Sequence, residues 1–237
     1  MDELRFLRAL HRPGTVVDVG AHDGLLTLPL SQLPGAEVLA FEPLPEAFRR
    51  LRAACGGLPG VTLRPEALGD VAGTVPLSVP VLDGVAQEQW ASTSKSYAAQ
   101  ESARVTVRRL DVPAITLDSL NLPGVTAMKL DAEGGEYEVL RGALGTLRRC
   151  RPVLTLELEE RHREGSTWAV PAFLDALDYV TCFALHGAWQ PMAALHRPSM
   201  QRASPDPAVF AASDPYVFNF YAWPIERDAE ARALLPG

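Results

Sequence analysis

The sequence predicts an α/β fold: a mostly parallel β-sheet with helices on both faces. Apolar runs at 15–19, 38–41 and 61–63 predict buried strands, and segments with helical spacing of apolar residues separate them. Uninterrupted apolar strands that alternate with helices are typical of parallel sheets covered on both sides. With 237 residues, 47% of them hydrophobic, the chain is long enough for one sizeable core, so we expect one domain.

The first part of the chain, residues 1–14, predicts a short N-terminal helix. Leu4, Leu7 and Leu10 follow near-helical spacing, and Pro13-Gly14 ends the helix. Proline and glycine also mark the ends of the helices that follow. The expected order is then strand 15–19, helix 24–33, strand 38–41, helix 45–54 and strand 61–63.

Residues 73–112 depart from this order. Two segments, 75–79 and 105–107, alternate like half-exposed strands, and the polar, Ser-rich segment 90–102 lies between them. We expect an insertion made of a small hairpin and a loop over the carboxyl edge of the sheet, with a plain surface loop as an equal alternative. The rest of a single domain, 15–237, would add strands at 126–130, 152–158, 179–185 and 217–223, and helices after 136, near 168–177 and at 225–235.

Composition and charge narrow the classes of partner. A net charge of −7 argues against nucleic acid, whose extended binding surfaces need clustered Lys and Arg. No apolar run approaches the roughly 20 residues of a membrane span, and residues 1–14 lack the apolar core of a signal peptide. The three cysteines are few and far apart, as expected of a reduced, cytoplasmic protein. The oligomeric state is left open.

The most informative stretch is the turn after the first strand, residues 18–24 (DVGAHDG). In open α/β sheets this turn holds nucleotide-like cofactors. Asp18 and Asp23 would repel a dinucleotide's pyrophosphate, at a cost of order 1 kcal/mol or more per close pair. A cationic ligand without phosphate, such as S-adenosylmethionine, suits the turn better than NAD. The alternative is that the glycines merely turn the chain. If the turn does hold a cofactor, the expected contact residues are Asp18, Gly20, Ala21, His22 and Gly24.

Acids near the ends of the next two strands fit the same pocket. Glu42 ends the second strand, where an acid accepts hydrogen bonds from two ribose hydroxyls; a charge at a helix N-terminus is the alternative. Glu66 and Ala67 follow the third strand, in the loop that borders the adenine pocket of a doubly wound sheet. An exposed loop acid explains Glu66 almost as well.

The candidate catalytic acids follow the fourth strand, in residues 129–136 (KLDAEGGE). Side chains 129 and 131 share one face because strands alternate, so Asp131 and Glu133 should emerge at the carboxyl edge of the sheet. They could steer the cofactor amine, orient an acceptor hydroxyl or hold a divalent cation, which the pattern allows but does not favour. The structural alternative is that Asp131 or Glu133 caps the next helix.

Two histidines are candidates for different roles. His162 follows the strand at 152–158 and titrates near neutral pH, which makes it a candidate general base, although a solvated histidine is more common in such a charged run. His22 would line the cofactor turn. The sequence lacks an Asn-Pro-Pro-Tyr-type stretch, an H-E-x-x-H, a P-loop and a G-x-S-x-G elbow. These absences favour transfer to oxygen.

Several blocks, taken in order, resemble the FkbM family of S-adenosylmethionine-dependent methyltransferases. The resemblance is in register over about residues 15–160, with a weaker echo near Asn219-Phe220. The blocks are 18–27, 41–43, 67–70, 117–120, 129–136 with 139–142, and 152–157.

This resemblance implies a Rossmann-like class I methyltransferase fold, a mostly parallel seven-stranded sheet with one antiparallel strand. It also implies methyl transfer to a hydroxyl of a small molecule such as a sugar, glycan or polyketide-type product. The cofactor positions carry over onto Asp18, Gly20, Gly24, Glu42 and Asp131.

Two residues depart from the family pattern, because His22 stands where Asn is usual and Glu66 where a small or amide residue is common. Two other functions stay open: a non-catalytic, cofactor-binding partner in a biosynthetic complex and, less favoured, a nicotinamide-dependent oxidoreductase. The acceptor itself has no pattern that we can decode, since substrate choice would lie in 73–112 and 186–215.

Overall fold

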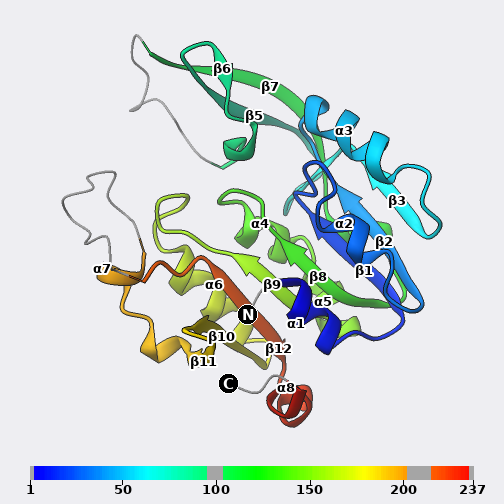
Figure 1. The fold of residues 1–237 in the computed structure, drawn as a ribbon, viewed down its shortest axis with the longest axis vertical. Coiled ribbons are helices and arrows are strands. Elements are labelled where there is room, and N and C mark those ends of the chain that lie inside the picture. Colours follow the sequence, from blue (N-terminus) through cyan, green and yellow to red (C-terminus); the bar gives the residue numbers. More distant parts are fainter. Residues whose placement is uncertain (1–2, 95–103, 202–214, 235–237) are drawn as a thin grey trace.

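The computed structural model describes residues 3–94, 104–201 and 215–234. Its main feature is an eight-stranded sheet in the order β11-β10-β12-β9-β8-β1-β2-β3 (Figure 1). The five strands β3, β2, β1, β8 and β9 run parallel, and β12 and β11 run opposite to the rest. The expected mostly parallel sheet is therefore confirmed.

The first half of the sheet alternates strands and helices, as the apolar runs predict. β1 and β2 are buried over their last four residues, whereas β3, expected to be buried, lies at the edge of the sheet and has no buried residue. The carboxyl ends of the three strands lie along one edge. The elements are α1 (Glu3–Ala9), β1 (Gly14–Val19), α2 (Thr27–Leu30), β2 (Ala36–Phe41), α3 (Pro45–Cys55) and β3 (Val61–Arg64).

The second half continues the pattern and then reverses direction. β8 (Val125–Leu130) pairs in parallel with both β1 and β9 (Val153–Glu157), so its end lies in the middle of the carboxyl edge. The remaining helices and strands are η3 (Leu117–Leu120), α4 (Glu136–Arg141), α5 (Leu144–Cys150), α6 (Ser166–Asp175), β10 (Tyr179–Leu185), β11 (Ala188–Pro191), η4 (Met192–Ala194), α7 (Arg197–Met200), β12 (Asn219–Pro224), η6 (Ile225–Arg227) and α8 (Asp228–Leu234).

Two further details differ from expectation. The sheet has an eighth strand, β11, which forms a hairpin with β10 through His186 and Gly187, both with positive φ, so a second strand runs antiparallel. The helix expected over 24–33 is a single regular turn, α2. Pro29 lies inside that segment and offers no backbone N–H, which explains why the turn does not extend into a longer helix.

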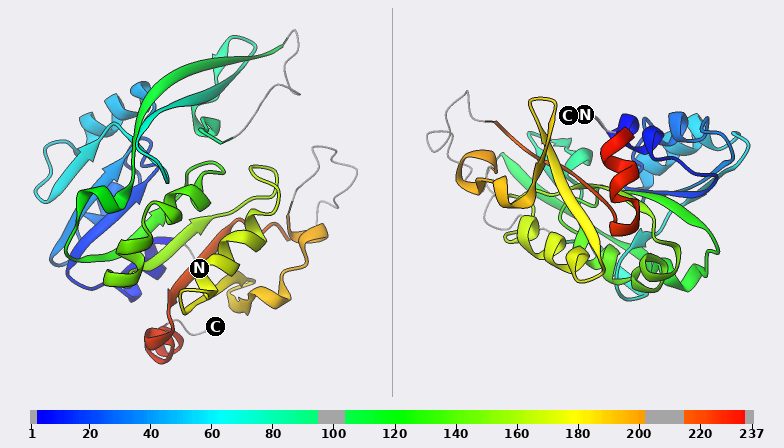
Figure 2. Two further views of the ribbon diagram at one scale, coloured as in Figure 1. Left: turned by 180° about the vertical axis from the view of Figure 1, so that it is seen from behind. Right: turned by 90° about the horizontal axis from the view of Figure 1, so that it is seen from below.

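Helices cover both faces of the main sheet (Figure 2). One face packs against α4, α5 and α6 through buried residues such as Val139, Leu147 and Val170. The other packs against α1, α2, α3 and α8 through residues such as Phe6, Leu51 and Ala231. Because both faces are covered, a ligand can reach the parallel strands only at their ends, and in open α/β sheets ligands bind at the carboxyl ends.

The segment expected as an insertion forms a second sheet, in the order β4-β7-β5-β6. β5 (Gly73–Leu82) and β7 (Val105–Ile115) make a long antiparallel hairpin, with β4 (Ala67–Leu68), β6 (Val85–Ala86) and η1 (Glu88–Trp90) beside it. We call residues 73–115 the hairpin insertion. It rises from the β3 side and extends above the carboxyl ends of the main sheet (Figure 1). Residues 95–103 of the expected loop lie outside the described residues.

Within the ranges that the structure describes, no helix has both the length and the apolar character needed to cross a bilayer.

Candidate active site

A cavity of about 490 Å³ lies at the carboxyl edge of the main sheet. Its walls come from the ends of β1, β2, β8 and β9, from the loop before β4, and from η1 and the segment after it in the hairpin insertion. Its size is in the range of pockets that hold cofactors and small ligands. The sequence places its predicted site residues at this edge, and most of them line this cavity: Gly20, Ala21, His22, Glu42, Glu66, Ala67, Asp131 and Glu133.

The turn after β1 is held against the turn after β8. Gly20 has φ +71°, and a Cβ added there would lie 1.9 Å from the carbonyl oxygen of Asp131. The backbone N–H groups of Gly20 and Ala21 both donate to Phe41 O at 3.0 Å, which fixes the turn to β2. His22 follows with φ +51°, a left-handed conformation that histidine adopts more readily than most residues. Only glycine at position 20 allows the turn after β1 to approach the backbone of Asp131 this closely.

Glu42 is buried at the end of β2 and faces the same turn. Its Oε2 accepts from His22 N–H at 2.9 Å, and its Oε1 accepts from Leu44 N–H at 2.8 Å. Burial raises the pKa of Glu42, while these two N–H groups act in the opposite direction. Each carboxylate oxygen has a second lone pair, so a ligand hydroxyl in the cavity can add a hydrogen bond.

Asp18 and Lys129 form a buried pair beneath the turn. They are neighbours in the β1–β8 register, with Lys129 Nζ 3.7 Å from Asp18 Oδ1 and 3.3 Å from Asp131 Oδ2. Lys129 Nζ also donates to Gly20 O at 2.7 Å and to Val19 O at 3.2 Å. Although burial lowers the pKa of Lys129, Asp131, Asp18 and Glu3 raise it by more, so the ammonium stays charged.

Asp18 itself is fully buried and does not line the cavity. Its Oδ2 accepts from Thr27 Oγ1 at 2.6 Å, which ties β1 to the helix that follows the turn. Gly24 is also behind the wall, where a Cβ would lie 2.7 Å from Cys55 Sγ. Neither residue lines the cavity, and both pack behind the turn after β1.

Glu66 and Ala67 lie at the opposite end of the cavity from β9. The Glu66 carboxylate accepts from Arg64 Nη2 at 2.7 Å and Nε at 3.2 Å. The bidentate contact with Arg64 therefore orients the Glu66 side chain beside the cavity, and only 18% of this side chain is exposed.

Neither Asp131 nor Glu133 caps α4, because the N-cap is Gly135, which has no side chain for the purpose. The loop is shaped by Glu136, whose Oε1 accepts from Ala132 N–H at 2.8 Å and Gly134 N–H at 3.1 Å. Burial raises the pKa of Glu136 to about 7. With the loop held in this way, Asp131 keeps 30% of its side chain exposed, within the cavity.

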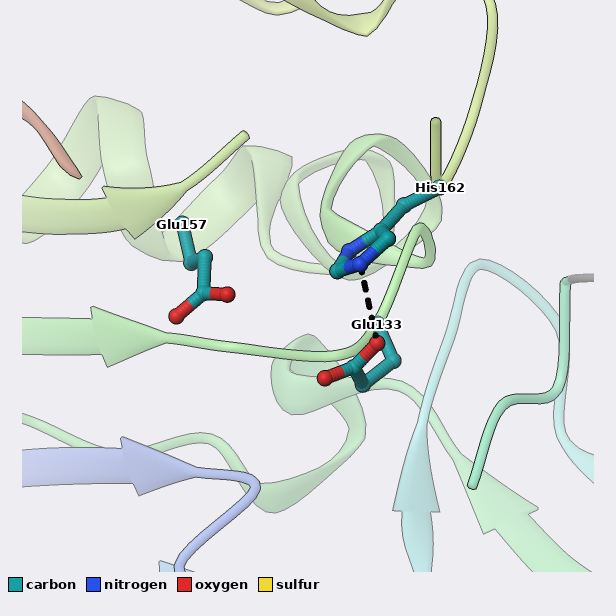
Figure 3. Close-up of side chains that lie close together, drawn as sticks. All are labelled: Glu133, Glu157 and His162. Carbon is teal, nitrogen blue, oxygen red and sulfur yellow. Dashed lines mark ion pairs between the residues drawn. The ribbon is translucent and has the colours of Figure 1, made fainter. Parts of the chain in front are cut away.

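His162 is buried at the edge of the same region, contrary to the more common solvated position. Only 3% of its side chain is exposed, and its Nε2 lies 3.1 Å from Glu159 Oε1 and 3.4 Å from Glu133 Oε2. Figure 3 shows its ring directed at Glu133, with Glu157 from the end of β9 beside them. His162 does not line the cavity, whereas Glu133 and Glu157 do.

The end of β9 is crowded with carboxylates. Burial, followed by the charges of Asp131 and Glu133, raises the pKa of Glu157 to about 9. Glu159 is paired with Arg161 through contacts of 2.6 and 2.7 Å. This crowding of carboxylates favours a proton or a cation in this part of the cavity.

Some lining residues were not predicted from the sequence. Glu3 approaches Lys129 and Asp131 from the first turn of α1, and burial raises its pKa. Glu88 and Trp90 reach the cavity from the hairpin insertion. Glu157 and Arg161 stand in the charged run around His162, so an expectation that strand ends carry functional groups could have included them. For Glu3, no local pattern signals the long-range packing of α1 against β9.

The comparisons with known proteins agree with the geometry. Residues 18–186 match the family described as the methyltransferase FkbM domain. No curated protein matches the chain.

Among solved structures, methyltransferase FkbM from Methylobacillus flagellatus superposes with a TM-score of 0.55 at 16% identity, over 90% of this chain and 45% of that one. This chain thus spans less than half of the length of that protein. A putative methyltransferase from Streptococcus mutans in complex with SAH gives a TM-score of 0.49 at 14% identity, over 93% of this chain and 94% of that one.

The family match covers more than two thirds of the chain and includes the turn after β1, Glu42 and the loop after β8. It confirms the resemblance that the motif blocks indicate, and with that family S-adenosylmethionine as the cofactor. The chain belongs to the FkbM family of S-adenosylmethionine-dependent methyltransferases.

Proposed function

We propose that this protein transfers the methyl group of S-adenosylmethionine to a hydroxyl of a small molecule. The observation that carries the proposal is one cavity with two unlike ends. At the β1–β2 end, the cavity is lined by the turn at Gly20 and the carboxylate of Glu42. At the β8–β9 end, it is lined by Asp131, Glu133 and Glu157. The first suits a nucleoside with free ribose hydroxyls, and the second suits an acceptor that must lose a proton.

The residues present fit the cofactor. Because Gly20 has no side chain, the turn after β1 packs directly on the Asp131 backbone, which brings the end of β8 beside the turn at the wall of the cavity. We propose that Glu42 accepts the ribose hydroxyls and that Glu66 and Ala67 border the adenine. Gly20, Ala21 and His22 would line the methionine half, with Asp131 near the ammonium group. Asp18 and Gly24 would act indirectly, by holding the turn.

When bound, S-adenosylmethionine supplies a methyl group on a sulfonium, which needs no activation by the protein. The acceptor oxygen forms the new C–O bond as the C–S bond breaks, and the electron pair of that bond stays on sulfur. The hydroxyl proton passes to a carboxylate, and we assign this role to Asp131 because 30% of its side chain is exposed, against 14% for Glu133. In the second arrangement Glu133, which also lines the cavity, accepts the proton, with His162 Nε2 behind it at 3.4 Å.

The hairpin insertion supplies the cover for the acceptor. Ser92 Oγ donates to the carbonyl oxygen of Glu133 at 2.6 Å, which fixes the hairpin to the loop after β8. Trp90 lines the cavity from the same segment and offers an apolar surface to the acceptor. We propose that residues 15–237 act as one domain in which this insertion selects a small-molecule acceptor. The three free cysteines favour a reduced, cytoplasmic location.

Calorimetric titration with S-adenosylmethionine tests the cofactor part of the proposal. We expect saturable binding by the wild-type protein and none of NAD. Glu42→Gln should weaken binding roughly tenfold or more, since hydrogen bonds to a charged group contribute about 1.5–3 kcal/mol. Glu37→Gln is the matched control, because Glu37 is an exposed acid on the same strand.

The transfer itself is tested by incubating the protein with a panel of alcohols and isotope-labelled S-adenosylmethionine. Label on an alkoxy carbon, together with S-adenosylhomocysteine release, is the expected result. Binding without any turnover over a broad panel of sugars and polyketide alcohols would favour a non-catalytic role instead. Labelled amines or thiols with unlabelled alcohols would contradict transfer to oxygen.

A further inference from the structure

We propose that Glu133, Glu157 and His162 bind a divalent cation of the Mn²⁺ or Mg²⁺ class, which holds the acceptor through two neighbouring oxygens. The inference rests on the proposed function for the role of the cation, but not for its binding. The three residues come from the loop after β8, the end of β9 and the turn that follows β9 (Figure 3). Together they form a cation site beside the acceptor end of the cavity.

The donor atoms are close enough for one ion. Each residue offers one ligand atom, and these atoms all lie within 4.8 Å of one another. Around an ion with ligand distances of about 2.0–2.2 Å, opposite ligands are about 4.0–4.4 Å apart and adjacent ones nearer. Small rotations of the two glutamate side chains therefore bring all three donors to coordinating distance. The two carboxylates supply hard oxygen ligands, and the imidazole supplies one nitrogen ligand. Mn²⁺ accepts this combination readily.

The backbone holds two of the three ligands together. Gly134 has φ +100°, and a Cβ there would lie 3.1 Å from the carbonyl oxygen of His162. Glycine at 134 thus lets the Glu133 loop approach the His162 turn closely. Glu133 has φ +52°, an uncommon conformation for a non-glycine residue, and its carbonyl accepts from Ser92. A sparsely populated conformation fixed by neighbours is typical of residues with a functional task.

The charge balance at this end of the sheet also favours a cation. The two permanent cations nearby already interact with other carboxylates. Lys129 lies among Asp18, Asp131 and Glu3, and Arg161 is paired with Glu159. Carboxylates outnumber cations in this group of described residues, which consists of Glu3, Asp18, Asp131, Glu133, Glu157, Glu159, Lys129 and Arg161. A divalent ion between Glu133 and Glu157 would offset that excess.

The site also predicts a class of acceptor. Three protein ligands leave coordination positions open in a six-coordinate ion, and Glu133 and Glu157 face the cavity. A vicinal diol or an α-hydroxy carbonyl could fill two adjacent positions. The ion then polarises the reacting hydroxyl, whose proton goes to Asp131. A simple monohydric alcohol would lack the second oxygen and bind poorly.

The competing explanation needs no metal. In it, a protonated His162 links Glu133 and Glu159 as a buried ion pair, for which distances of 3.4 and 3.1 Å are also suitable. The two explanations differ in what the protein binds, so a direct binding measurement separates them.

The test is a Mn²⁺ titration of the full chain, without acceptor, followed by electron paramagnetic resonance of free Mn²⁺. We expect saturation at one ion per chain. Glu157→Gln and His162→Gln should each raise the Kd for Mn²⁺ by more than about tenfold, since even loss of an outer-shell partner costs 10–100-fold. Glu164→Gln is the control, because this exposed acid lies two residues from His162.

Calorimetry with S-adenosylmethionine on the same samples separates the possible failures. Variants that keep cofactor binding are folded, so their loss of Mn²⁺ reports the site itself. No saturable Mn²⁺ binding by wild-type protein that binds S-adenosylmethionine would overturn the cation site and leave the proposed function standing. Mn²⁺ binding that survives both substitutions would likewise overturn it.

Discussion

The two ends of the cavity hold their carboxylates in different ways. At the cofactor end, Glu42 is buried but accepts two backbone N–H groups, from His22 and Leu44. At the acceptor end, Glu157 faces Asp131 and Glu133, and its pKa rises to about 9. Both are glutamates at the ends of parallel strands, so position in the fold does not distinguish them. Their nearest neighbours do.

This difference suggests a division of labour. A carboxylate already held by N–H donors is preorganised to accept further hydroxyls, as a ribose requires. A carboxylate among other carboxylates lacks such compensation and has its highest affinity for a proton or a metal ion. We infer that the cofactor end recognises hydrogen-bond donors, whereas the acceptor end recognises positive charge.

The largest effect is expected from a substitution at Gly20, where the turn after β1 packs against the loop after β8. Gly20→Ala places a Cβ 1.9 Å from the Asp131 carbonyl and requires a positive φ from alanine. Strain of this kind costs of order 1–3 kcal/mol per residue, and the overlap adds to it. We expect S-adenosylmethionine binding to be lost in calorimetry, with a lower unfolding temperature. Gly57→Ala, which adds a Cβ where no atom lies within 4 Å, should bind normally.

A second, pH-dependent effect is expected at the acceptor end. Because folding raises the pKa of Glu157 from 4.5 to about 9, the folded protein binds a proton more tightly than the unfolded chain. The contribution of Glu157 to wild-type stability is therefore fully present below pH 4.5 and is lost as the pH rises toward 9. Glu157→Gln has no such proton to bind.

Thermal unfolding without added metal measures this difference. The unfolding temperature of Glu157→Gln minus that of wild type should increase from pH 5 to pH 9. A difference that is constant over this range would show that Glu157 is compensated like Glu42, and would remove the contrast between the two ends.

A smaller effect is expected where the hairpin insertion meets the acceptor end. Ser92→Ala removes the hydrogen bond to Glu133 and the one that Ser92 Oγ accepts from Ser94 N–H, each a change of about 1 kcal/mol. We expect kcat/KM for the acceptor to fall several-fold while the Kd of S-adenosylmethionine is unchanged. Ser31→Ala, which removes a hydroxyl-to-carbonyl bond on the surface, is the control. Equal loss of cofactor affinity would show that the hairpin serves the whole cavity.

Much of the cofactor end could be predicted from the sequence because its signals are local. Residues 18–24 and Glu42 follow strands that are visible as apolar runs, and strand ends meet at one edge of a parallel sheet. The sequence does not show which of these residues face the cavity: Asp18 has the right position but points beneath the turn, toward Lys129 and Thr27.

The acceptor end could be predicted only in part, since it depends on contacts between distant segments. Glu3 reaches the cavity from α1, and Glu88 and Trp90 reach it from the hairpin insertion. Neither the packing angle of a short helix nor the course of a long hairpin follows from periodicity. His162 illustrates the same limit, because a charged run predicts exposure and the β9 turn instead buries the ring.

Two substitutions measured side by side test the division of labour most directly. Glu42→Gln and Glu157→Gln should each be titrated with S-adenosylmethionine and, separately, with Mn²⁺. We predict that Glu42→Gln weakens only the cofactor, by roughly tenfold or more, and that Glu157→Gln weakens only the metal ion, by a similar factor. Equal losses of both ligands in both variants would contradict two separate ends and indicate one undivided acidic pocket.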